Sequence, residues 1–164
     1  DLLDLSVLEN GQVSLNERVG KIGDVLNQAV AAAGIENSRL RVVRSKVRED
    51  LMIYTDLDRL SQVFINLISN ALRFVPNENG WINIHWNVTD NKEIILTVTD
   101  NGPGILGKIN EQVFEPFYTT KSQGTGLGLA VVKSVAQSHQ GHVKVTNLAD
   151  GGACFTISLP FNYF

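Results

Sequence analysis

Two amides and an arginine, Asn66, Asn70 and Arg73, form a polar pattern that could bind a metal ion or a phosphate. They stand at positions i, i+4 and i+7 of a largely apolar segment, residues 56–74, so in a helix the three side chains lie one above another. An amide oxygen can ligate Mg²⁺, and a guanidinium can bind a phosphate. A solvated face is the commoner interpretation of such a stripe, but solvated faces favour Glu and Lys because Asn is a weak helix former. The alternative interpretation is the wall of a polar pocket.

A carboxylate ends one apolar strand pattern. Ile94, Leu96, Val98 and Asp100 alternate through residues 93–100, so they share a face, and Asp100 is predicted at the edge of the core. Burying a carboxylate is costly unless hydrogen-bond donors point at it. Two interpretations stay open: Asp100 caps the turn at residues 101–102, or it accepts a hydrogen bond from an exocyclic amine such as that of adenine.

Residues 101–128 form a long loop with six glycines and two prolines, and loops of this length are usually functional or disordered. Residues 102–108 match the phosphate-binding pattern G-x-x-x-x-G-K, but Ile109 stands where that motif needs Ser or Thr, so we reject it. Residues 124–128, GTGLG, do not match the dinucleotide fingerprint. They do precede a predicted helix, whose free backbone N–H groups favour a phosphate.

The elements that would position these residues are helices and strands in a mixed order. Apolar periodicity predicts helices at 19–33, ended by Gly34, at 56–74 and at 129–138, with the tail of another at 1–9. Strands are predicted at 40–43 and 52–54, around a charged turn, and at 81–88, 93–99, 142–146 and 153–159. We predict an α+β fold: a two-layer α/β sandwich with a mixed, mostly antiparallel sheet and helices on one face.

Length and composition fit one domain, with 164 residues, 43% hydrophobic residues and a net charge of −3. This acidic balance, without a Lys/Arg block, disfavours a nucleic-acid binder. The lone Cys154 excludes an internal disulfide, and the sequence has no zinc cluster. No apolar run approaches the ~20 residues that cross a bilayer, and no signal peptide is visible. Because the chain opens at Asp1, partway through an apolar pattern, we expect it to be a piece of a longer protein.

Four segments, in this order, resemble the sequence boxes of the ATP-binding catalytic domain of bacterial sensor histidine kinases, which has the Bergerat (GHKL) fold. They are RLSQVFINLISNALRF (residues 59–74, the N box), DNGPGI (100–105, the first glycine box), VFEPFYTTK (113–121, the F box) and GTGLGLAVV (124–132, the second glycine box). Together the boxes span residues 59–132, roughly half the chain, and their combination in this order is specific. The F box and the helix after it look most similar to kinases that partner sigma-54 response regulators.

The resemblance implies roles for the matched residues. Asn70 would ligate Mg²⁺, Asn66 beside it would polarise the phosphates, and Arg73, where the family often has Lys, would contact a phosphate. Asp100 would bind the adenine N6 amine. Residues 106–123 would form the ATP lid, with Phe114 and Phe117 anchoring it. The other implied ATP contacts are Phe74, Gly102, Gly104 and Ile105 around the base, and Lys121, Thr125, Gly126, Leu127 and Gly128 around the phosphates.

The implied protein is a Mg²⁺- and ATP-dependent histidine kinase of a two-component phosphorelay. Residues 1–15 would end a dimerisation hairpin and its linker, and residues 16–164 would form the catalytic domain. None of His85, His139 and His142 lies in a His-Glu/Asp context that opens a helix, so the acceptor histidine is expected upstream, and this fragment should not phosphorylate itself. The implied partners are the protein's own upstream dimerisation domain and a response regulator receiver domain. The full-length protein would be a homodimer, with this domain cytoplasmic and in contact with neither membrane nor nucleic acid.

Two other functions compete with this interpretation. Water-activating ATPases of the same fold resemble one another in carrying Glu where this chain has Asn66, and an amide cannot act as the general base that hydrolysis needs. A histidine acceptor brings its own lone pair and needs no such base. A nucleotide-sensing module with a decayed site is disfavoured because every box is intact. We therefore predict in-line transfer of the γ-phosphoryl group, in which positioning and Mg²⁺ carry most of the catalysis.

Overall fold

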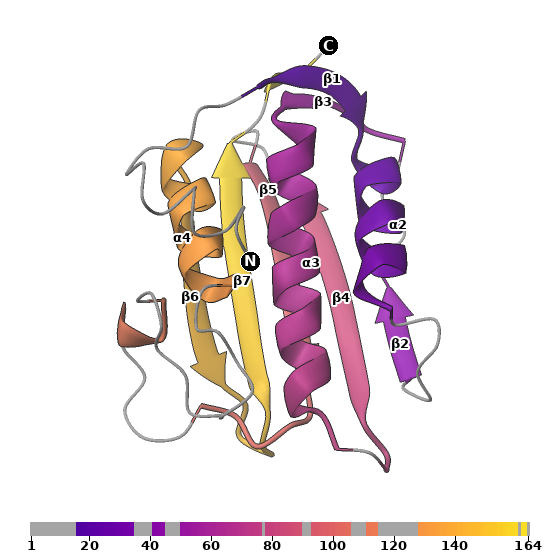
Figure 1. Cartoon of the computed structure of the whole chain (residues 1–164), viewed down its shortest axis with the longest axis vertical. Coiled ribbons are helices and arrows are strands. Elements are labelled where there is room, and N and C mark those ends of the chain that lie inside the picture. Colours follow the sequence, from indigo (N-terminus) through magenta and orange to yellow (C-terminus); the bar gives the residue numbers. More distant parts are fainter. Residues whose placement is uncertain are drawn as a thin grey trace.

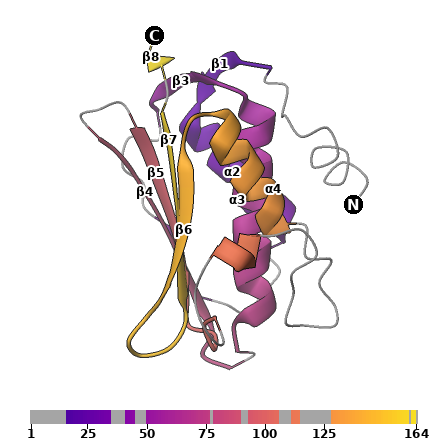
Figure 2. The same cartoon turned by 90° about the vertical axis from the view of Figure 1, so that its left-hand side faces the viewer.

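The fold, described by a computed structural model for residues 16–34, 41–44, 50–76, 78–89, 93–105, 111–114, 128–160 and 162–163, has a layer of helices on one face of a sheet (Figures 1 and 2). The sheet runs in the order β2–β4–β5–β7–β6. Its first pair, β2–β4, is parallel, and the other three pairs are antiparallel. These strands are β2 (Arg41–Arg44), β4 (Trp81–Val88), β5 (Glu93–Asp100), β6 (His142–Asn147) and β7 (Ala153–Pro160). The predicted mixed, mostly antiparallel sandwich is confirmed.

Three helices, α2 (Ile22–Ala33), α3 (Leu57–Phe74) and α4 (Gly128–Ser138), lie on the same face of this sheet (Figure 2). Figure 1 shows α3 between the other two. The core lies between the two layers, because alternate strand residues point toward the helices. One row of aligned core residues crosses four strands: Ile84, Val98, Phe155 and Val145 are register neighbours and are all buried. Each such side chain contributes about 1.5–3 kcal/mol on burial.

A second, three-stranded sheet in the order β1–β3–β8 lies across the upper end of the molecule in Figure 1. It consists of β1 (Arg18–Lys21), β3 (Met52–Thr55) and β8 (Asn162–Tyr163). The predicted helix start at residue 19 is therefore wrong, because residues 18–21 pair antiparallel with β3 and α2 begins at Ile22. Close packing contributes to this arrangement, since a Cβ atom at Gly20 would lie 2.5 Å from Cδ1 of Leu57. The strands predicted around a charged turn, β2 and β3, belong to different sheets.

Most other predicted elements are confirmed to within one or two residues, including α3, β4, β5, α4, β6 and β7. Gly34 ends α2 as predicted, in a left-handed conformation with φ of 77° and its N–H bonded to the carbonyl oxygen of Ala31. The short 3₁₀ helix η2 (Glu111–Phe114) was not predicted. The helix tail predicted at 1–9 lies outside the described residues. Among the described residues, no helix has the length and apolar character needed to cross a membrane.

Candidate functional site

Three segments that are distant in sequence face one another in the lower half of Figure 1: the C-terminal half of α3, the end of β5 and the first turn of α4. Gly102, just after β5, lies so close to α3 that a Cβ atom there would be 2.5 Å from the carbonyl oxygen of Phe74. On α3, Nδ2 of Asn66 donates a hydrogen bond to the carbonyl oxygen of Gly128 in α4, at 3.2 Å. The N box therefore contacts both glycine boxes, the first at the C-terminal end of α3 and the second near the middle of α3.

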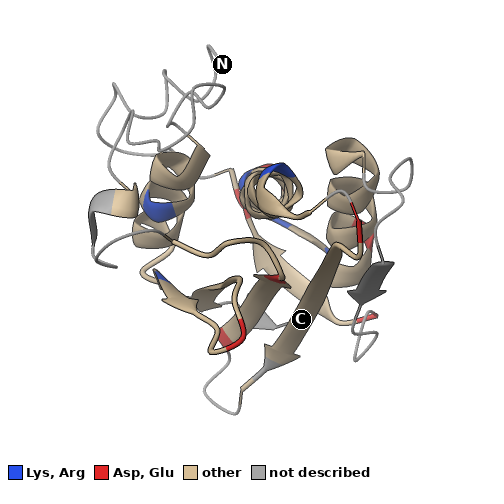
Figure 3. Ribbon diagram, turned by 90° about the horizontal axis from the view of Figure 1, so that it is seen from below, with Lys and Arg blue, Asp and Glu red and all other residues tan. Residues whose placement is uncertain are grey.

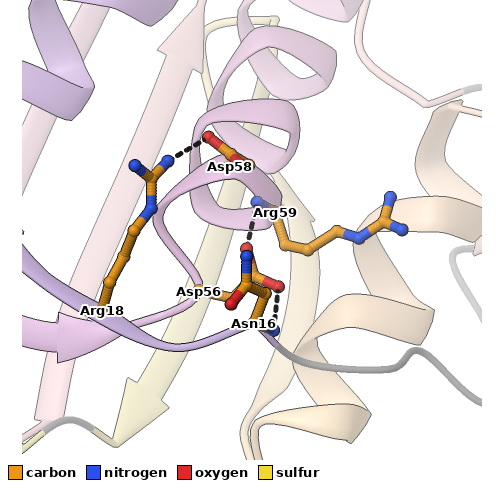
Figure 4. A network of polar contacts seen from close by, with 5 residues as sticks. All are labelled: Asn16, Arg18, Asp56, Asp58 and Arg59. Atoms are coloured by element: carbon orange, nitrogen blue, oxygen red, sulfur yellow. Dashed lines mark hydrogen bonds and ion pairs between the residues drawn. The ribbon is translucent and has the colours of Figure 1, made fainter.

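A buried carboxylate fixes the opposite end of α3 (Figure 4). Asp56 is 3% exposed, and its Oδ1 accepts the N-cap hydrogen bond from the backbone N–H of Arg59 at 3.0 Å. Its Oδ2 accepts from the backbone N–H of Asn16 at 2.8 Å. Nearby, the exposed side chains of Arg18 and Asp58 form an ion pair of 2.6 Å. One carboxylate thus holds both the start of α3 and the segment that leads into β1.

The predicted polar stripe occupies the less buried side of α3. Asn66 and Asn70 are half-buried, and Arg73 is exposed in the last turn. Because Asn66 is hydrogen-bonded to α4, this part of the stripe lines the seam between two helices. Ile65 and Leu72 of the same helix are also only partly buried. The buried residues of α3 are Leu60, Val63, Phe64, Leu67, Ile68 and Ala71.

Asp100 is 2% exposed and ends β5 at the edge of the core. Its Oδ1 accepts from the backbone N–H of Gly102 at 2.8 Å, and the backbone N–H of Ala153 donates to the same carboxyl group. Burial raises the pKa of Asp100 above its ordinary value of 3.8, and the two backbone hydrogen bonds oppose that rise. The predicted burial and the predicted cap of the 101–102 turn are both confirmed. The contact with adenine stays a prediction.

The first glycine box depends on the absence of side chains at two positions. A Cβ atom at Gly102 would also lie 3.0 Å from Oδ1 of Asp100, in addition to the overlap with Phe74. Gly104 has φ of +80°, a left-handed conformation that favours glycine, and a Cβ atom there would lie 2.7 Å from Oδ1 of Asn147. Because both positions are glycine, the backbone of residues 102–105 can lie this close to the end of β5 and to β6.

Sequence reasoning missed the turn between β6 and β7. Oδ1 of Asn147 accepts from the N–H of Ile105 at 2.7 Å, and its Nδ2 donates to the carbonyl oxygen of Ile105 at 3.0 Å. Gly152 has φ of +99°, and a Cβ atom there would lie 2.0 Å from the carbonyl oxygen of Asp100. The glycine pair at 151–152 was the available signal, because a Gly–Gly pair marks a turn whose conformation other residues rarely adopt.

Part of the predicted F box can be placed. Phe114, at the end of η2, is 5% exposed, and its ring packs edge-on against Phe155 of β7 with centroids 6.4 Å apart. This is the packing expected of an anchor. The predicted residues that lie outside the described part of the chain are Phe117, Lys121, Thr125, Gly126 and Leu127.

The three histidines lie where the sequence places them, and none opens a helix. His85 is exposed on β4 and His142 is exposed at the start of β6. His139 is buried just after α4, with Nδ1 2.9 Å from the carbonyl oxygen of Val135.

Figure 3, a view from below, shows basic positions on α3 and α4, the two helices that border the site. In the described ranges, no three His, Cys, Asp or Glu residues group as metal ligands.

Comparisons with known proteins show which family this chain resembles. The family model described as histidine kinase-, DNA gyrase B-, and HSP90-like ATPase matches residues 55–163. The sensor histidine kinase TmoS of Ectopseudomonas mendocina is 30% identical over 98% of this chain and 17% of its own length. The sensor histidine kinase ZraS of Salmonella typhimurium is 44% identical over 66% of this chain and 23% of its own length. This chain therefore spans less than a quarter of the length of these relatives.

Solved structures agree with this placement. The catalytic domain of histidine kinase ThkA superposes with a TM-score of 0.77 at 27% identity, covering 88% of this chain and 97% of that one. Full-length ShkA, in complex with AMPPNP, gives a TM-score of 0.80 at 25% identity, covering 99% of this chain and 35% of that one. The chain belongs to the family of histidine kinase-, DNA gyrase B- and HSP90-like ATPases. Within that family, it is an ATP-binding catalytic domain of the kind found in sensor histidine kinases, which are ATP-dependent protein kinases.

Proposed function

We propose that this domain binds Mg²⁺–ATP and presents the γ-phosphoryl group to a histidine in an upstream dimerisation domain. The observation that carries the proposal is the hydrogen bond from Asn66 to the carbonyl oxygen of Gly128. An ionised Glu at this position could only accept, so it could not make that bond and would face a carbonyl oxygen instead. Because an amide cannot activate water, Asn66 favours transfer to a histidine, whose imidazole brings its own lone pair, over hydrolysis.

The base would bind near the end of β5. Asp100 is a buried acceptor anchored by two backbone N–H groups, which suits an acceptor for the adenine N6 amine. Gly102 and Gly104 let the backbone beside Asp100 pack against Phe74 and Asn147, and on the sequence resemblance they would also let it approach the base. Phe74 and Ile105 border the same segment. These features fit an adenine nucleotide.

The phosphates and the metal would lie between α3 and α4. Asn70 offers an amide oxygen for Mg²⁺, and Arg73, one turn further along α3, offers a charge for a phosphate. Gly128 opens α4, where a helix N-terminus attracts phosphate. The metal would neutralise charge on the transferring group. We also propose the phosphate contacts at Lys121, Thr125, Gly126 and Leu127 and a lid at residues 106–123, on the sequence resemblance alone.

The wider assignments rest on the same resemblance. We propose that residues 1–15 end a dimerisation hairpin and its linker, and that 16–164 form the catalytic domain. The F box and the helix after it support a kinase whose response regulator is of the sigma-54 class. The full-length protein would be a homodimer that passes its phosphoryl group to a receiver domain. This domain would work in the cytoplasm, and it would contact neither membrane nor nucleic acid directly.

The experiment that tests the transfer uses γ-labelled ATP with this chain alone and with the full-length protein. We expect label on the full-length protein only, lost in acid and stable in base, as a phosphohistidine is. Rapid release of free phosphate by this chain, with no labelled protein in either sample, would show an ATPase and overturn the proposal.

The metal assignment has its own test. Asn70→Ala should remove the Mg²⁺-dependent part of ATP binding, so that its Kd is the same with Mg²⁺ and with EDTA in calorimetry. Asn83→Ala is the matched control, because Asn83 is an exposed asparagine of β4. A folded Asn70→Ala variant with wild-type affinity for Mg²⁺–ATP would refute the ligand role.

A further inference from the structure

We propose that Asn147 is a positioning residue of the nucleotide site. From the end of β6, its side chain holds the backbone of the first glycine box. This inference rests on the proposed ATP site. Asn147 is the last residue of β6 and stands 42 positions from Ile105, the residue it binds. It lies in none of the four sequence boxes.

The contact consists of two hydrogen bonds between one side chain and one residue's backbone. Oδ1 accepts from the N–H of Ile105 at 2.7 Å, and Nδ2 donates to the carbonyl oxygen of the same residue at 3.0 Å. An adjacent strand would offer this pairing through its backbone. The Asn147 amide thus substitutes for a strand neighbour where β6 has ended, and it fixes both polar groups of Ile105 at once.

The contact between Asn147 and Ile105 requires glycine at position 104. Its φ is +80°, and a Cβ atom there would lie 2.7 Å from Oδ1 of Asn147 and 3.1 Å from the carbonyl oxygen of Gly152. A side chain at position 104 would therefore displace the amide that holds Ile105. The glycine of the box and the asparagine of β6 form one packing arrangement.

The same hairpin holds the other end of the glycine segment. Asn147 and Ala153 are register partners, the last pair of β6 and β7 before the turn. Asn147 binds Ile105, and Ala153 donates its N–H to the carboxyl group of Asp100. Residues 100–105 are thus attached to one hairpin at both ends. Loss of Asn147 releases the Ile105 end and leaves Asp100 in place.

This separation defines the expected result. In calorimetry with ADP and Mg²⁺, Asn147→Ala should weaken binding about tenfold, because the glycine segment must then be ordered by the ligand. The preference for ADP over inosine diphosphate, which lacks the N6 amine, should stay as in wild type, because Asp100 keeps its two backbone donors. Asn83→Ala, an exposed asparagine of β4, should bind ADP as wild type does.

Hydrogen exchange supplies a readout that does not depend on nucleotide. The N–H of Ile105 donates to Asn147, so Asn147→Ala should lose protection at the Ile105 amide. The amide of Leu96, within β5, should keep its protection and show that the fold is intact. Thermal unfolding of the variant should stay close to wild type, because the Asn147 side chain is exposed.

The outcomes separate this inference from the proposed function. Weaker ADP binding with an unchanged nucleotide preference and a deprotected Ile105 amide supports the positioning role. Wild-type ADP affinity in Asn147→Ala, despite the deprotected amide, would overturn the positioning role and leave the ATP site standing. Absence of ADP binding by the wild-type chain would overturn the proposed function, and this inference with it.

Discussion

Substituting Gly152 by alanine should destabilise the fold more than the same substitution at the neighbouring Gly151. The two glycines have nearly the same φ, +99° and +98°, outside the range that L side chains readily adopt. Their surroundings differ. A Cβ atom at Gly152 would lie 2.0 Å from the carbonyl oxygen of Asp100, whereas among the described residues one at Gly151 would approach the carbonyl oxygen of Gly102, at 3.8 Å. The pair therefore separates backbone strain from steric overlap.

The magnitudes follow from these distances. Holding alanine at such a φ costs about 1–3 kcal/mol at either position. The overlap at position 152 is with backbone, which cannot rotate away, so the β6–β7 turn or the end of β5 must move. Overpacking of this kind costs about 1–3 kcal/mol more. We therefore expect the free energy of unfolding to fall by about 1–3 kcal/mol in Gly151→Ala and by about 2–6 kcal/mol in Gly152→Ala.

Urea unfolding followed by tryptophan fluorescence measures both variants, because Trp86 is fully buried and reports on the core. The loss is large against the roughly 5–15 kcal/mol that stabilises a typical domain. Gly152→Ala should also weaken ATP binding, since the backbone that must move carries Asp100. Equal destabilisation by the two substitutions would contradict this prediction, because it would show that the turn does not constrain Asp100.

Two further predictions concern the ends of α3 and β5. Asp56→Ala removes the acceptor for Arg59 and Asn16 and should lower the unfolding free energy by about 1–3 kcal/mol. Asp58→Ala loses an exposed ion pair and an acidic side chain in the first turn of α3, and it should cost about 1 kcal/mol. Equal losses of the two variants in urea unfolding would contradict the capping role of Asp56. The raised pKa of Asp100 means that the folded chain binds this proton more tightly than the unfolded chain, so the resulting stabilisation is complete below pH 3.8 and is lost as pH rises through the folded pKa. Urea unfolding at a series of pH values measures this fall in the free energy of unfolding, which should be absent in Asp100→Asn. If the variant's stability fell in parallel with that of wild type, Asp100 would be excluded as the cause.

The parts of the fold that the sequence predicts correctly are those with local signals. The helix α3 has Asp56 as its cap, an apolar periodicity along its length and Pro76 just beyond its end. The alternation in β4 and β5 marks the buried row directly. The polar stripe and Asp100 could be selected as candidates for the same reason, because each interrupts an otherwise regular apolar pattern.

Pairings between distant segments were not predictable in this way. Residues 19–21 were predicted as the first turn of a helix, because the pairing with β3 that makes residues 18–21 a strand leaves no mark in their own sequence pattern. Asn147 looks like any polar strand end until the fold brings it to Ile105. The hydrogen bond from Gly102 to Asp100 is local, so the turn cap could be predicted from the sequence. The second donor to the Asp100 carboxyl group, Ala153, comes from β7 and could not. Register and close approach are properties of the folded chain, and they explain these omissions.

In the proposed function, the end of β5 and the polar stripe of α3 form an adenine nucleotide site. Calorimetric titration of Mg²⁺–ATP and Mg²⁺–GTP into the wild-type chain and into Asp100→Asn tests it most directly. We expect wild type to bind ATP at least about tenfold more tightly than GTP, the worth of one hydrogen bond to a charged group, and Asp100→Asn to lose that preference. Equal affinity of wild type for ATP and GTP, or unchanged ATP binding by Asp100→Asn, would contradict the account.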